Sequence, residues 1–318
     1  MMLSLPRAFC ASIASAIVCL FFLLPLCAQE KPHISGAAVL TLTKEFLAAA
    51  PKRFNGSPGH TAAEKFIVSH FEPEQRDRRL EIDTFTATTP AGLQTMHNII
   101  VKFPSSNPSK KDSIILLATH YETNYPLRDI NFIGANDGAC TSALLLAIGQ
   151  YYRAHPPQGA SIWLLFDDGE EAVKAWSSSD SLYGTRHLAA KWSQEGVLPR
   201  IKALLLADMI GYKDLNIDHD DNSSPALLEM LKVAAKNTGH ANAIYRNHTA
   251  IEDDTVPFKQ RGVPVLDIID IDYGPPTAEH PEGSYHHTAE DTIDKLSARS
   301  LQTAADLFME MIRLLDQH

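Results

Sequence analysis

Imidazole and carboxylate side chains are the residues of this sequence best suited to chemistry. Five of them are candidate metal ligands: His120, Asp137, Glu171, Asp208 and His287. Imidazole nitrogens and carboxylate oxygens, with no thiolate among them, are typical of a catalytic zinc site that keeps a coordination position open. Glu170 directly precedes Glu171, so it is a carboxylate held near the metal without binding it, as a general base must be. The pattern predicts a zinc-dependent catalytic centre.

Four of these residues also have a purely structural interpretation. Asp137 stands directly before a helical pattern, where Asp is a favoured N-cap. Glu170 and Glu171 suit the first turn of a helix, and His287 suits a polar loop. Two adjacent glutamates cannot share one environment, however, so we expect different roles for them. The combination of residues, and no single one, favours the metal centre.

The elements that position these side chains follow from the apolar pattern. Buried strands are predicted at 114–118, 162–166, 203–207 and 263–266, with further strands at 78–88 and 95–103. Helical patterns lie at 37–49, 60–72, 139–153, 182–193 and 224–238, and a last helix has Leu301 to Leu315 on its apolar face. This alternation predicts an α/β fold with a mostly parallel sheet covered on both sides. His120, Asp167–Glu171, Asp208 and Asp267 follow the four central strands, at the sheet edge where ligands bind.

Composition and the first residues restrict the class of protein. The 318 residues carry a formal charge of −10 with no long Lys/Arg run, which argues against a nucleic-acid partner. An apolar run at 11–26 after Arg7 predicts an export signal over residues 1–28, and a periplasmic or secreted domain over 29–318. Because that run is long, an uncleaved membrane anchor is the alternative. No other membrane partner is expected, and the sequence does not indicate an oligomeric state.

Asp218-His219-Asp220-Asp221 is a polar stretch outside this pattern. Its composition is that of a calcium loop, but it lacks the spacing and the central Gly of an EF-hand. We therefore expect a solvated loop.

Several blocks of the sequence resemble the zinc aminopeptidase family, which also contains the glutaminyl cyclases. The blocks are Asp168–Ala172 with Trp176, Asp180–Ala189, Ile251–Asp254 with Pro257-Phe258, and Arg261–Leu266. The resemblance runs from roughly residue 90 to the end, and these blocks match the cyclase branch more closely than the peptidase branch. It implies a single-domain, three-layer αβα sandwich with a mixed, mostly parallel central sheet.

The resemblance also implies roles for the candidate site residues. Asp137, Glu171 and His287 would hold one zinc ion; in the peptidase branch, His120 and Asp208 would bind a second one, with Asp137 bridging. The implied catalytic residues are Glu170 as acid/base, with Asp208 and Asp253 in a hydrogen-bonded acidic group. The implied substrate contacts are Trp176, Asp254 and His286.

This chain departs from the family pattern at several positions. Cyclases usually have His, Trp and His where this sequence has Thr255, His286 and Asp267. The peptidase branch usually has His-x-Asp where this chain has His120-Tyr121-Glu122. Loss of the Trp changes the wall of the substrate pocket, and the extra acid at Asp267 bears on the pairing of Asp208 with Asp253.

The activity implied first is conversion of an N-terminal Gln of peptides to pyroglutamate, with release of ammonia. The alternative is a zinc aminopeptidase that hydrolyses N-terminal residues. Both take a peptide or protein N-terminus as substrate. A peptide- or sugar-binding protein that has lost catalysis is disfavoured, because Glu170 and every candidate ligand are present.

Overall fold

The computed structural model describes Met1 and residues 33–317, so the predicted leader, apart from Met1, lies outside the described residues. The described helices and strands all belong to one compact unit, Pro32–His318. Among the described residues, no helix is both long enough and apolar enough to cross a bilayer.

A six-stranded mixed sheet forms the centre of this unit. Its strands, in spatial order, are β1 (Leu80–Thr89), β2 (Gly92–Phe103), β4 (Ser161–Asp167), β3 (Ile114–His120), β5 (Ile201–Asp208) and β8 (Val265–Ile269). β1 and β2 form an antiparallel hairpin, β2 pairs antiparallel with β4, and the remaining pairs are parallel. Each of the six predicted strands overlaps one of these, and the mixed, mostly parallel sheet is confirmed.

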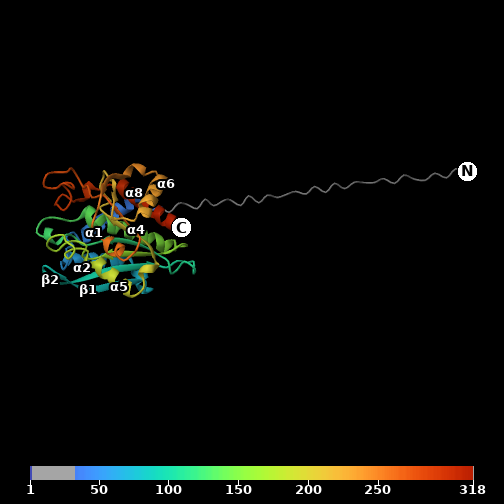
Figure 1. Cartoon of the computed structure of the whole chain (residues 1–318), viewed down its shortest axis with the longest axis horizontal. Helices are drawn as coiled ribbons and strands as arrows, with labels where there is room; N and C mark the ends of the chain where they lie inside the picture. The colour runs from blue at the N-terminus through green and yellow to red at the C-terminus, as the bar shows by residue number, and fades with distance from the viewer. Residues whose placement is uncertain (2–32, 318) are drawn as a thin grey trace. The chain divides into compact units, whose positions relative to one another are not determined.

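Helices cover both faces of the sheet, as predicted. The first face carries α1 (Gly36–Ala49), α2 (Pro58–His70), α4 (Cys140–Ala154), α6 (Pro225–Thr238) and α8 (Ala298–Gln317), whereas α5 (Tyr183–Gln194) and the short α7 (Val256–Lys259) cover the second. The short helix α3 (Glu72–Arg76) follows α2. In Figure 1, α6 and α8 lie at the top of the unit and α5 at the bottom, with strands between them.

Successive side chains of the central strands pack alternately into two hydrophobic cores, one on each face of the sheet. Every residue of β3 is buried; Leu117 packs into the core beneath α4, and its neighbour Leu116 packs into the core beneath α5. Side chains of a strand point alternately to the two faces, so a strand covered on both sides needs apolar residues at successive positions. Parallel strands end at a common edge, and this brings the terminal residues His120, Asp167 and Asp208 together.

Two expectations about individual segments are wrong. Asp267 does not follow the fourth strand but lies inside β8, opposite Leu206 of β5. The stretch at 218–221 is not a solvated loop: most of it belongs to β6 (Ile217–Asp220), which pairs in parallel with β7 (Ile244–Thr249) in a second, two-stranded sheet. Asp218 and Asp220 are fully buried there because backbone N–H groups donate to their carboxylates.

A buried arginine fixes the loop that precedes α4. Arg53 has no solvent exposure, and burial lowers its pKa to about 10. Its guanidinium donates to five backbone carbonyl oxygens at 2.7–3.3 Å: those of Ala50, Tyr121, Ile133, Gly134 and Asp137. These carbonyls belong to three separate segments, so one planar side chain joins them.

We predict that replacing Arg53 destabilises the fold. In R53A, five buried carbonyls lose their donor, and the free energy of unfolding should fall by about 3 kcal/mol or more. R53K keeps a charge but not the planar fork, so its loss should be intermediate. Urea unfolding of both variants, with R76A at an exposed site as the matched control, measures these losses. An R53A protein within about 0.5 kcal/mol of wild type would contradict this role.

Candidate active site

A tight turn presents Asp137 at the sheet edge. The segment η2 (Ala135–Ala139) precedes α4, and the Asp137 backbone leaves helical geometry there, with φ −87° and ψ 96°. Gly134 has φ 54°, and a Cβ on it would lie 2.4 Å from the carbonyl oxygen of Asp137, so the turn requires glycine. Among the residues that the structure describes, no side chain caps α4. Asp137 is therefore not the N-cap that its position also allowed.

Asp137, Glu171 and His287 form the first group of candidate ligands, with Asp137 contributing Oδ2. His287 Nε2 lies 3.3 Å from Asp137 Oδ2 and 3.2 Å from Glu171 Oε1. Both carboxylate oxygens are buried and accept no hydrogen bond within the described part of the chain. His287 reaches this place from a loop, with a left-handed backbone φ of 52°, which is uncommon for a residue other than Gly.

His120, Asp137 and Asp208 form the second group of candidate ligands, with Asp137 contributing Oδ1. His120 Nε2 lies 3.1 Å from Asp137 Oδ1 and 3.4 Å from Asp208 Oδ1. In each group the three ligand atoms lie within 4.8 Å of one another. Asp137 therefore gives one oxygen to each group, which is how a carboxylate bridges two metal ions.

The charges of the two groups fit divalent cations. Burial opposes protonation of His120 and His287, but their acidic neighbours raise the pKa of both well above the ordinary value. The same imidazoles hold the pKa of Asp137 well below its usual range, although burial opposes this. A cation balances these carboxylates equally well and leaves both imidazoles neutral, as metal ligands must be. Buried carboxylate and imidazole donors without hydrogen bonds match the preferences of zinc.

Further residues hold the candidate ligands and their backbone by hydrogen bonds. Asn124 Nδ2 donates to Glu171 Oε2 at 2.6 Å. Asp291 accepts from the backbone N–H groups of Asn136 and Asp137, at 2.8 and 3.2 Å. Sequence analysis missed these residues and Arg53. Arg53 and Asp291 act on backbone groups and Asn124 on a side chain, all in distant segments, and no spacing along the chain marks such contacts.

Glu170 is buried beside the two groups. Its Oε2 lies 3.9 Å from His120 Nδ1. Burial, and then the charge of Glu171, raise the pKa of Glu170 well above its ordinary value. A carboxyl group with a raised pKa can both accept and release a proton near neutral pH, which is the requirement for a general acid/base.

More acids lie against Asp208. Burial and the charge of Asp208 raise the pKa of Asp253 well above its usual range, and burial and Asp253 do the same to Asp267. Asp254 differs from its neighbour: Thr185 Oγ1 donates to it at 2.5 Å beneath the site. Asp254 does not line the hollow, so its position gives no support to a substrate contact.

A hollow of about 560 Å³ is lined by most of the candidate ligands and acids: Asp137, Glu170, Glu171, Asp208, Asp253 and His287. Besides ligands and acids, Trp176 and His286 line it, the positions expected of substrate contacts. Trp176 is 41% exposed, and His286 Nδ1 pairs with Glu282 at 3.2 Å. Most of the lining is acidic or imidazole side chains, and Trp176, Ile269 and Ile271 add apolar surface.

Comparison with known proteins agrees with this geometry. The model of peptidase family M28 matches residues 98–312. The glutaminyl-peptide cyclotransferase of Bos taurus is 32% identical over 285 residues, covering 79% of this chain and 74% of that protein. A crystal structure of an Acidobacteriales bacterium glutaminyl cyclase is 66% identical with a TM-score of 0.88, covering 91% of this chain and 98% of that one.

A zinc-dependent exopeptidase from Parabacteroides distasonis shares the fold. It is 22% identical with a TM-score of 0.74, and the match covers 91% of this chain and 100% of that one. The M28 match includes all five candidate metal ligands, His120 to His287. The chain therefore belongs to peptidase family M28, in the branch that contains the glutaminyl cyclases.

Proposed function

We propose that this protein is a zinc-dependent glutaminyl-peptide cyclotransferase that converts an N-terminal Gln of peptides to pyroglutamate. The observation that carries the proposal is the buried Glu170, whose raised pKa suits proton transfer, next to the ligand Glu171. Asp137, Glu171 and His287 would hold the zinc ion. The choice of cyclisation is supported by the 66% identity to a glutaminyl cyclase over 91% of the chain.

The reaction needs a proton to move within the substrate. The α-amine nitrogen bonds to the side-chain amide carbon, the bond from that carbon to the amide nitrogen breaks, and ammonia leaves. Glu170 takes the proton from the α-amine and delivers it to the departing nitrogen, so its charge is unchanged after one turnover. When bound, zinc supplies Lewis-acid polarisation of the amide carbonyl.

The acidic group holds the leaving nitrogen and the walls hold the substrate. Asp253 has a raised pKa because it is buried against Asp208, so it keeps a proton and can hydrogen-bond the substrate amide. Trp176 and His286, on the walls of the hollow, would hold the Gln side chain so that amine and carbonyl meet.

A zinc aminopeptidase is the second candidate function, and one observation favours it. His120, Asp137 and Asp208 form a second ligand group that shares Asp137 with the first. Two ions held in this way would suit hydrolysis, in which Glu170 deprotonates a water molecule that attacks the first peptide bond.

We predict that the zinc-loaded protein acts on a peptide beginning with Gln and leaves the matched peptide beginning with Leu intact. Mass spectrometry of both reactions measures the products, and loss of ammonia from the Gln peptide is the expected result. Release of free Leu would overturn the cyclase proposal in favour of the aminopeptidase.

We predict that E170Q abolishes turnover, with a loss of about 10²-fold or more, because an amide cannot carry the proton. Zinc content and the unfolding midpoint should stay at wild-type values. E252Q, an exposed glutamate of the same hollow, is the matched control and should retain activity. Full activity in E170Q would exclude the acid/base role.

We predict that D137A and H287A lose bound zinc, because each removes a ligand of the first group. Elemental analysis of the purified proteins measures this, with H280A, outside both groups, as control. H120A separates the two stoichiometries: it keeps the full zinc content if one ion is bound and loses one ion if two are bound. Unchanged zinc in both D137A and H287A would contradict the ligand assignment.

A further inference from the structure

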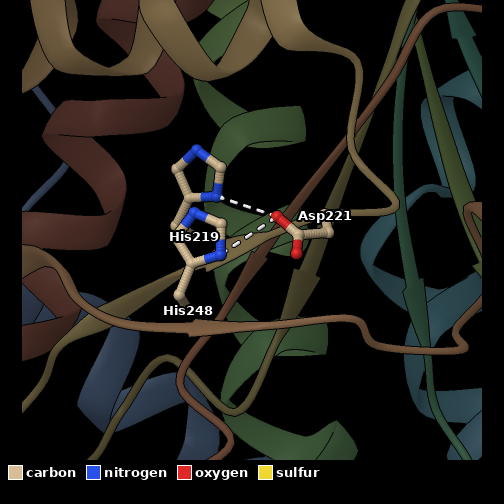
Figure 2. A group of neighbouring side chains, drawn as sticks. All are labelled: His219, Asp221 and His248. Carbon is tan, nitrogen blue, oxygen red and sulfur yellow. Dashed lines mark ion pairs between the residues drawn. The ribbon is translucent and has the colours of Figure 1, made fainter.

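Two histidines face the same way on the small second sheet. His219 of β6 and His248 of β7 are register partners in the parallel ladder. Their rings stack with centroids 3.9 Å apart and planes 15° apart. Figure 2 shows both rings turning a nitrogen toward the carboxylate of Asp221. Because the two histidines are neighbours on adjacent strands, both imidazoles lie beside the carboxylate of Asp221.

The three side chains offer one set of donor atoms. The Nδ1 atoms of His219 and His248 lie 3.4 and 3.1 Å from the same oxygen, Asp221 Oδ1. All three donor atoms lie within 4.8 Å of one another. His219 Nδ1 is shielded from solvent and makes no hydrogen bond among the described residues. A buried nitrogen without a hydrogen bond costs free energy that a bound cation would recover.

The backbone under the cluster is fixed. The buried carboxylate of Asp220 accepts from the N–H groups of Asn222 and Ile251, at 2.9 and 3.0 Å. Asp221 N–H donates to the Thr249 carbonyl at 2.8 Å. These bonds join the segment with His219 and Asp221 to the segment with His248. The donors are therefore held in place before any ligand arrives, which lowers the entropic cost of binding.

We propose that His219, Asp221 and His248 bind a divalent transition-metal ion of the zinc, copper and nickel class. Imidazole nitrogens select these metals, and one carboxylate completes a three-residue set with positions left for water. Asp221 and His248 are more than half exposed, so the site is open to metal from solution. It is separate from the buried groups around Asp137, although His248 also lines the rim of the hollow. The inference does not depend on the proposed activity.

Metal binding to the zinc-loaded protein tests the proposal without an activity assay. Equilibrium dialysis against Zn²⁺ should show one ion per chain beyond the buried centre. H248A and D221N, both at exposed positions, should each weaken that extra ion by more than about 100-fold, since even residues behind the ligands account for 10–100-fold. H155A removes an exposed histidine that stacks on Tyr151 outside the cluster, and should change nothing.

Spectroscopy identifies the ligands. One equivalent of Cu²⁺ added to the zinc-loaded protein should give an electron paramagnetic resonance spectrum with couplings to two imidazole nitrogens, reduced to one in H248A. Absence of an extra ion in the wild type would overturn the proposal, and the cluster would then be only a contact of two histidines with Asp221. An extra ion that persists at full affinity in H248A and D221N would overturn it equally. The variants should keep the zinc of the buried centre. A loss of the extra ion alone is thereby distinguished from a loss of metal at the catalytic centre.

Discussion

Everything at the catalytic edge depends on one buried carboxylate that serves two imidazoles. Asp137 places one oxygen against His287 and the other against His120, and its depth makes an uncompensated charge costly. The glycine turn at Gly134, the hydrogen bond that Arg53 donates to the Asp137 carbonyl and the acceptor Asp291 all hold the backbone of this one residue. The parallel strands supply the rest, because they deliver His120 and Asp208 to the same place.

The acids around this carboxylate divide into two electrostatic environments. Asp137 stays charged between positive or metal-bound neighbours, whereas burial beside other acids favours the neutral form of Glu170, Asp253 and Asp267. When the environments of neighbouring acids push their pKa values apart, one acid can serve as a metal ligand while another transfers protons. This division is compatible with cyclisation and with hydrolysis, which is why the fold alone does not choose between them.

The sequence predicted what depends on local pattern, and missed what depends on long-range contacts. Strands buried on both faces are continuous apolar runs, so β3, β4 and β5 and the residues that end them could be found from the sequence. The sequence did not reveal β6, because its two buried aspartates accept hydrogen bonds from distant segments: Asp218 from Ile271, 53 residues away, and Asp220 from Ile251, 31 residues away. Arg53 and Asp291 were missed for the same reason. The substrate contact expected of Asp254 stays a prediction, and its carboxylate accepts a hydrogen bond from Thr185.

His287, which has a left-handed backbone, belongs both to the first group of candidate ligands and to the wall of the hollow. A non-glycine residue at φ 52° keeps this conformation because the surrounding structure holds it there. His286 is its immediate neighbour and forms part of the wall of the hollow. If His287 holds zinc as proposed, chelation would free its side chain and loosen the adjacent wall at His286. Zinc binding and peptide binding would then be linked through one backbone torsion, and each would strengthen the other by the same factor.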